Sequence, residues 1–176
     1  TTTDQAGNTA SQTYTVKIDK TAPTCTTSGG SSSWTNGNRN ITGTCSDTGG
    51  SGCTGNSSQS YTTDIDTTTA NPGKVYDVAG NSANCPNATV KIDKTAPSCS
   101  VTGGNSSWTN GNRKITATCS DSGSGCATSP FSKTYSTDIN TTTAGANGDN
   151  SGGTVYDNAG ISENVSTIYS DDNGVT

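Results

Sequence analysis

The sequence predicts an all-β protein of tandem β-sandwich units stapled by disulfides, and three observations support this. The octapeptide Val-Lys-Ile-Asp-Lys-Thr-Ala-Pro occurs unchanged at residues 16–23 and 90–97, so the chain repeats with an offset of 74 residues. Short runs of alternating apolar and polar residues are separated by turn residues at intervals of about 8–12, without a helical period. Seven Cys occur in a chain that has no Met and no His.

The octapeptide marks the boundaries between units. Its Val and Ile alternate with Lys and Asp, which predicts a strand with one buried face. The proline that ends it lacks a backbone donor and favours an extended conformation before it, so a short stiff junction is expected. We therefore divide the chain into residues 1–20, which are the last strands of a preceding unit or a donor strand, a first unit at 21–94 and a second at 95–176.

Residues 1–19 read as a turn followed by a strand. Asp-Gln-Ala-Gly-Asn at residues 4–8 is typical of a tight turn with a left-handed glycine. Tyr14, Val16 and Ile18 then alternate with polar residues, which predicts a strand with one apolar face.

The first unit is expected to contain short strands joined by polar turns. Asn36-Gly37 is a strong hairpin signal between two of them. The expected strands cover residues 24–27, 41–45, 61–65 and 75–77 and the octapeptide strand, with a polar loop at 46–53 and turns at 71–73 and 79–81.

The second unit repeats this order. Positions from Trp108 to Ile139 lie 74 residues after their counterparts, whereas Tyr156 and Asp157 lie 80 residues after theirs. The sequence therefore predicts a six-residue insertion within residues 145–153.

The composition leaves little material for a hydrophobic core. Ile, Val and Phe total 17 residues, a share under the roughly 20% below which disorder is suspected. The regular alternation and the recurring Cys and Trp argue against a disordered linker. Small domains with few buried apolar side chains are usually stabilised by covalent cross-links. The Cys residues therefore indicate disulfides and an oxidising, extracellular setting. Without His or a CxxC pair, zinc sites are not expected.

Charge and hydropathy exclude several partners. The net charge of −5, with 9 basic residues, argues against nucleic acid and anionic membranes. No run of 18 apolar residues is present, so no membrane span is expected in this segment. The absence of a signal peptide favours a mature or internal segment of a longer extracellular chain.

Three motifs together resemble one family. The octapeptide, the Asp-x-Ala-Gly-Asn turn and the Cys-Ser-Asp-(x)-Gly-Ser-Gly-Cys loop are similar to the bacterial immunoglobulin-like tandem repeats of large cell-surface and adhesin proteins. The resemblance covers essentially the whole chain. It implies immunoglobulin-like sandwiches in a secreted or surface protein that forms a rod, stalk or filament displaying an adhesive tip. Two departures are Ile161, which replaces the turn Asn, and the lack of a further Lys-Thr-Ala-Pro.

The cysteines are predicted to pair within each unit. Cys25 and Cys45 flank the Asn-Gly hairpin, so they are expected to bond. The position that matches Cys85 is Val165 in the second unit, so Cys126 is expected to lack a partner. The predicted bonds are Cys25–Cys45, Cys53–Cys85 and Cys99–Cys119.

Aspartates recur in three places: the polar loops, the Ala-Gly turns and the junctions. The interpretation that the sequence favours is turn capping by their own side chains. The alternative is calcium, which takes six to eight oxygen ligands and which junction aspartates can hold in the resembling adhesins. No cofactor is required by the sequence. The junction aspartates are Asp19 and Asp93, and the calcium candidates are Asp47, Asp77, Asp93, Asp121 and Asp157.

Trp34 and Trp108 sit beside the hairpin turns, where packing is favoured over stacking on a surface glycan. The tyrosines at 61, 76, 135 and 156 also read as core. An enzyme is not expected, because no nucleophile has a base beside it in the sequence.

The leading hypothesis is a structural rod whose partners are neighbouring repeats or other copies. The alternatives are a glycan-binding module and a filament subunit that donates the strand in residues 1–19.

Overall fold

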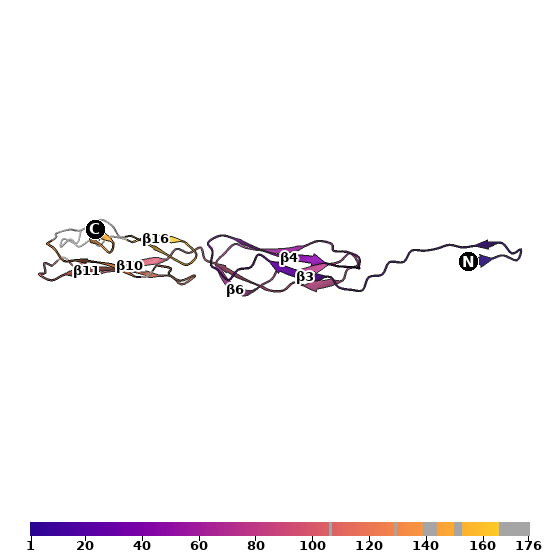
Figure 1. The fold of residues 1–176 in the computed structure, drawn as a ribbon, viewed down its shortest axis with the longest axis horizontal. Helices are drawn as coiled ribbons and strands as arrows, with labels where there is room; N and C mark the ends of the chain where they lie inside the picture. Colours follow the sequence, from indigo (N-terminus) through magenta and orange to yellow (C-terminus); the bar gives the residue numbers. More distant parts are fainter. Residues whose placement is uncertain (106, 129, 139–143, 150–152, 166–176) are drawn as a thin grey trace.

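The computed structural model describes residues 1–105, 107–128, 130–138, 144–149 and 153–165. Every regular element in these ranges is a β-strand, so the all-β prediction is confirmed. Figure 1 shows an elongated molecule in which a small N-terminal hairpin, an extended segment, the first unit and the second unit follow one another along the long axis.

The first unit contains one three-stranded sheet and two strand pairs. The sheet has the order β3-β4-β5, β6 pairs with β9, and β7 pairs with β8, all antiparallel. The strands are β3 (Thr24–Ser28), β4 (Arg39–Ser46), β5 (Ser57–Tyr61), β6 (Ile65–Ala70), β7 (Lys74–Tyr76), β8 (Ser82–Asn84) and β9 (Ala88–Ile92).

The second unit repeats this pairing where it is described. Its sheet has the order β10-β11-β12, and β15 pairs with β16. Figure 1 places β10 and β11 in one layer and β16 in the other. The strands are β10 (Ser98–Thr102), β11 (Arg113–Ser120), β12 (Phe131–Tyr135), β13 (Ala144–Gly145), β14 (Gly148–Asp149), β15 (Thr154–Tyr156) and β16 (Ser162–Asn164). The β13–β14 pair falls where the insertion was predicted.

Each unit has a thin core of small aliphatic side chains. In the first unit the buried residues Ile41, Ala70, Val90 and Ile92 come from β4, β6 and β9. In the second unit the corresponding cluster contains Ile115, Ala117, Ala146, Val155 and Val165. The alternation of buried and exposed residues along β4 and β11 is the pattern expected for strands with one inner face.

Among the predicted local elements, the Ala-Gly turns are confirmed, whereas the strand over residues 61–65 is not. The Ala-Gly turns have the expected left-handed glycine, with φ of 94° at Gly80 and 86° at Gly160. The strand predicted over residues 61–65 is wrong, because β5 ends at Tyr61 and β6 begins at Ile65. Residues 62–64, which include a bend at Thr63, therefore separate two strands where the sequence pattern predicted one.

The N-terminal segment contains a hairpin of β1 (Thr2–Thr3) and β2 (Thr9–Ala10), but residues 14–18 form no strand. Tyr14, Val16 and Ile18 are 73–79% exposed. The identical Val-Lys-Ile sequence in β9 is paired with β6. The prediction of a strand is wrong here, because these described residues have no strand beside them.

The disulfides differ from the predicted pairing. The two positions predicted to bond, Cys25 and Cys45, do lie opposite each other in the β3–β4 register, but each bonds to a different segment. Their side chains lie on the inner face of the sheet, where Cys85 arrives after β8 and Cys53 arrives from the polar loop. The bonds are Cys25–Cys85, Cys45–Cys53 and Cys119–Cys126, which corrects all three predicted pairs.

The free cysteine is Cys99, not Cys126 as predicted. Cys99 is the counterpart of Cys25, and Val165 stands at the position of Cys85, the bonding partner of Cys25, so it is Cys99 that loses its partner. Burial is the main cause that raises the pKa of the Cys99 thiol, against the Thr118 backbone hydrogen bond and with a smaller contribution from Glu163.

Candidate metal centres

Two matching clusters of aspartates occupy the end at which the chain enters each unit. Each contains a junction Asp, a loop Asp that directly follows β4 or β11, and a turn Asp that follows β7 or β15. Within each cluster, one oxygen from every carboxylate lies within 4.8 Å of the other two. We call them the first triad, Asp19, Asp47 and Asp77, and the second triad, Asp93, Asp121 and Asp157. All five calcium candidates lie in the triads, and Asp19 completes them.

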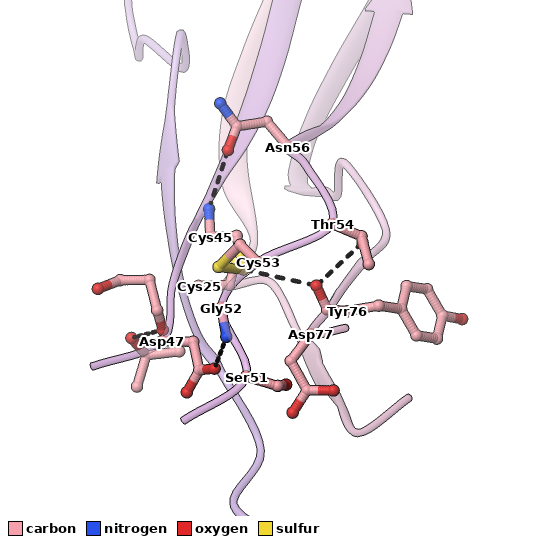
Figure 2. Close-up of a disulfide and its surroundings, with 12 residues drawn as sticks. Cys25, Cys45, Asp47, Ser51, Gly52, Cys53, Thr54, Asn56, Tyr76 and Asp77 are labelled. Carbon is pink, nitrogen blue, oxygen red and sulfur yellow. Dashed lines mark hydrogen bonds between the residues drawn. A yellow bond between two sulfur atoms is a disulfide. The ribbon is translucent and has the colours of Figure 1, made fainter. Parts of the chain in front are cut away.

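The loop aspartate is held in place by the short disulfide loop. Cys45–Cys53 closes the loop that carries Asp47, and the Gly52 backbone N–H donates to Asp47 Oδ2 at 2.8 Å. Figure 2 shows this disulfide with Asp47 and Asp77 on the same side of it. In the second unit the Gly125 N–H donates to Asp121 Oδ2 at 2.6 Å. In each unit the short disulfide loop thus positions one carboxylate of the triad.

The turn aspartate is buried and caps its own turn. Asp77 is 1% exposed and Asp157 is 2% exposed. Asp77 Oδ1 accepts a hydrogen bond from the Asn81 backbone N–H at 2.7 Å, and Asp157 Oδ1 accepts the equivalent bond from Ile161 at 2.7 Å. The capping role predicted from sequence is therefore confirmed for these two side chains. Because a carboxylate oxygen has two lone pairs, capping leaves room for a cation.

The junction aspartate connects the entering chain to the unit ahead of it. Asp93 Oδ2 accepts from the Ser124 N–H at 2.6 Å, and its Oδ1 accepts from the Thr95 N–H at 3.0 Å. Asp19 makes the same two bonds, to the N–H groups of Ser51 and Thr21. The linker carboxylate therefore sits inside the loop of the next unit.

Two glycines make space for the junction carboxylate. A Cβ on Gly50 would lie 2.6 Å from Asp19 Oδ2 and 2.7 Å from both Asp47 carboxylate oxygens. A Cβ on Gly123 would lie 2.5 Å from Asp93 Oδ2. Since real Cβ atoms do not approach other atoms this closely, the loops are shaped around the carboxylates.

The two junction carboxylates favour the ionised form. Burial raises the pKa of Asp93, but hydrogen bonds from Ser124 and Thr95 outweigh it and leave the pKa below its ordinary value. The pKa of Asp19 is lowered by its hydrogen bonds from Thr21 and Ser51. Three adjacent negative charges repel one another, and a divalent cation among them would reverse this repulsion. The donor set, which is carboxylate oxygen throughout, fits a hard cation such as calcium.

The triads differ at the residue that follows the Ala-Gly turn. In the first, the Asn81 side-chain amide donates to Asp77 Oδ2 at 2.7 Å and to the Asp19 carbonyl oxygen at 3.2 Å. In the second, Ile161 stands in place of Asn81, and Asp157 Oδ2 is buried without a hydrogen-bond partner. A buried carboxylate oxygen without a donor is costly, so a positive ligand at this atom would be favourable.

The aromatic residues do not follow the packing prediction uniformly. Trp34 is half-buried, with Lys91 Nζ 5.0 Å from its ring centroid, whereas Trp108 is 80% exposed and its predicted packing is wrong. Tyr61 and Tyr135 pack against the cores as predicted. The core prediction is wrong for Tyr76 and Tyr156, which are 47% and 49% exposed. Glycan binding by Trp34 and Trp108 stays a prediction.

The sequence singled out the triad aspartates, but it did not show that they lie close together in space. The signal that was present is their repetition: each member of the second triad lies at the aligned position of a member of the first, 74 residues later for Asp19 and Asp47 and 80 residues later for Asp77. Among the described residues, no helix is both long and apolar enough to cross a membrane. Comparisons with protein-family models, curated proteins and solved structures give no match to this chain.

Proposed function

We propose that the chain is a structural segment of an extracellular rod, stalk or surface filament, in which calcium fastens each unit to the segment that enters it. The observation that carries this proposal is the make-up of the triads. Each combines a carboxylate of the entering linker with two carboxylates of the unit ahead. A cation bound there cross-links the linker to that unit.

Cross-linking at the junction would limit bending between successive units. Asp93 is already tied to both sides, since its backbone N–H donates to the Thr35 carbonyl of the first unit and its carboxylate accepts from Ser124 of the second. The proline that follows, Pro97, is buried and restricts the backbone further. The elongated arrangement in Figure 1 is what such a rod requires.

An extracellular location accords with the covalent and ionic chemistry together. Three disulfides persist most readily in oxidising compartments. Extracellular modules commonly bind calcium with dissociation constants of about 10⁻⁴–10⁻³ M. Sites built from three carboxylates and few other ligands suit that range.

Small-angle scattering of the full chain, with calcium and with a chelator, tests the proposal. We expect an extended two-unit profile in both conditions, with less flexibility in calcium. Asp93→Asn should remove most of the calcium response, whereas Asp138→Asn, an exposed carboxylate outside the triads, should retain it. A compact profile, or a profile indifferent to calcium, would contradict the proposal.

A second candidate function is filament assembly by strand donation. It is favoured by the exposure of Tyr14, Val16 and Ile18, the apolar face of a segment whose sequence twin is a buried strand in β9. An unpaired strand of this kind can add to the edge of a sheet in another chain. This candidate is compatible with the rod, because it supplies a way to join segments end to end.

A further inference from the structure

We infer that the two triads are unequal cation sites, and that the residue after the Ala-Gly turn, Asn81 or Ile161, sets their order of filling. The second triad, at the junction between the two units, takes the calcium-sized cation first and holds it more tightly. The inference rests on the proposed calcium function and adds to it a rule for which site fills at which concentration.

The two sites share their general plan, so the contribution of the residue after the turn can be stated for one atom, the second oxygen of the turn carboxylate. Both have the same three Asp positions, and in both the turn and junction carboxylates accept from equivalent backbone N–H groups. The loop carboxylates share the Gly52 and Gly125 donors, and Asp121 Oδ1 also accepts from the Gly123 N–H at 3.3 Å. In the first triad the Asn81 amide occupies Asp77 Oδ2 at 2.7 Å. In the second triad the side chain of Ile161 has no donor, and Asp157 Oδ2 is left unpartnered.

The amide acts as a built-in competitor for the cation. A cation entering the first triad must share or displace the Asn81 hydrogen bond, and it would also disturb the bond from that amide to the Asp19 carbonyl. A cation entering the second triad replaces nothing at Asp157 Oδ2 and relieves a buried unpaired charge. Hydrogen bonds to charged groups contribute about 1.5–3 kcal/mol, which corresponds to roughly tenfold or more in affinity.

Two further differences act in the same direction. The junction carboxylate is half-buried in the first triad but 1% exposed in the second, so the attraction for a cation is less screened by water there. The loop of the second triad is also more firmly held. Asn158 Nδ2 donates to the Ser124 and Gly125 carbonyl oxygens at 3.0 and 3.1 Å, and Val78 at the aligned position of the first unit has no side-chain donor. A preorganised loop gives up less entropy when the cation binds.

Tryptophan-sensitised terbium luminescence separates the two sites. Trp34 and Asp93 line the same hollow at the junction between the units, next to the second triad. The eight residues of β4 separate the Trp34 hairpin from Asp47 by roughly 25 Å. Strand β11 places Trp108 equally far from Asp121. Terbium emission excited through tryptophan therefore reports the second triad, and Trp34→Phe should abolish it.

The experiment titrates the full chain with terbium, and separately with calcium by calorimetry. For the wild-type chain we expect two classes of calcium site, with tryptophan-sensitised terbium emission saturating in the tighter class. Ile161→Asn should weaken the second triad about tenfold or more, and Asn81→Ile should tighten the first by a similar factor. Each substitution introduces the side chain that the other turn already carries, so both variants are expected to fold. Asp138→Asn is the control for loss of one charge.

The outcomes distinguish the inference from the proposed function. Equal affinities at the two triads, or an unchanged second site in Ile161→Asn, overturn the inference and leave the calcium rod standing. No calcium binding at either triad, in a chain that is folded by circular dichroism, overturns both. Loss of the tighter class in Asp157→Asn, with the weaker class retained, assigns the tight site to the second triad.

Discussion

At the scale of single residues, the two units fill the same interior space in two different ways. In the first unit the Cys25–Cys85 disulfide passes over Gly43, and a Cβ there would lie 2.5 Å from Cys85 Sγ and 3.0 Å from Cys25 Sγ. In the second unit the aligned positions are Ala117 and Val165, which are buried in an apolar cluster. The side chains of Ala117 and Val165 thus fill the space that the Cys25–Cys85 disulfide fills in the first unit, which explains how the second unit retains a core without this bond.

Substitution at Gly43 should reveal this exchange. We expect Gly43→Ala to destabilise the first unit by about 1–3 kcal/mol, because the added methyl group overpacks the disulfide. The aligned change Ala117→Gly should cost about 1 kcal/mol by a different route, through lost burial and greater chain entropy. Chemical denaturation under non-reducing conditions measures both. Reduction of the disulfide should lessen the penalty of Gly43→Ala, and a penalty that persists unchanged would locate the clash elsewhere.

At the scale of secondary-structure elements, the sequence predicts features set by consecutive residues, but it does not predict features that depend on pairing with a distant segment. Alternation along a strand is a property of consecutive residues, so β4, β9 and the Ala-Gly turns were predictable. The Val-Lys-Ile sequence is a strand only in β9, where β6 lies beside it, and not in residues 14–18. The same sequence therefore has two structures, because strand formation requires a neighbour.

The disulfides and triads were unpredictable for the same reason. The β3–β4 register makes Cys25 and Cys45 neighbours, but sequence does not show that Cys85 approaches from another layer. Four cysteines allow three pairings, and sequence spacing alone could not choose among them. The members of the second triad are separated by 28 and 36 positions, so only the folded chain brings them within 4.8 Å.

The exposed segment at residues 14–18 gives a test at this scale. If it donates a strand, the chain should associate with increasing concentration, and Val16→Lys with Ile18→Lys should keep it monomeric by removing the apolar face. Asp19 and the first triad remain intact in this variant. Sedimentation or light scattering measures the association. The matched control is Lys17→Ser, on the other face of the segment, which should still associate; equal behaviour of both variants would exclude pairing through Val16 and Ile18.

At the scale of the whole molecule, the junction carboxylates should couple stability to pH. The pKa values of Asp19 and Asp93 are lowered from the ordinary 3.8, so the folded chain prefers their ionised forms. Their contribution is fully present above the unfolded pKa and is lost as the pH falls through the folded pKa. We expect stability that is level near neutrality and declines below about pH 4.

Thermal unfolding across this range, in a chelator to remove the effect of cations, measures the decline. Asp93→Asn should make the loss of stability at low pH smaller, by the part of that loss that Asp93 contributes. Asp138→Asn should leave the curve unchanged, since Asp138 is exposed and lies outside both triads. A wild-type curve that is level down to strongly acidic pH would contradict the assignment of lowered pKa values to folding.

A second set of contacts at the junction is made by the first unit to the linker that leaves it. Asp64 accepts hydrogen bonds from the Lys94 backbone N–H at 2.8 Å and from the Thr95 hydroxyl at 2.7 Å, and Lys94 Nζ donates to Asn38 Oδ1 at 2.6 Å. Calcium in the second triad would fasten Asp93 to the unit ahead, whereas Asp64 fastens the next two residues to the unit behind. A rigid joint requires contacts on both sides, because a linker held only by the unit ahead can still bend relative to the unit behind.

We therefore expect Asp64→Ala to broaden the range of orientations between the two units, measured by scattering and by nitrogen relaxation, even at saturating calcium. The calcium affinity should be unchanged. The aligned Asp138→Ala should have no such effect on this joint; if Asp64→Ala is equally silent, the cation alone sets the rigidity.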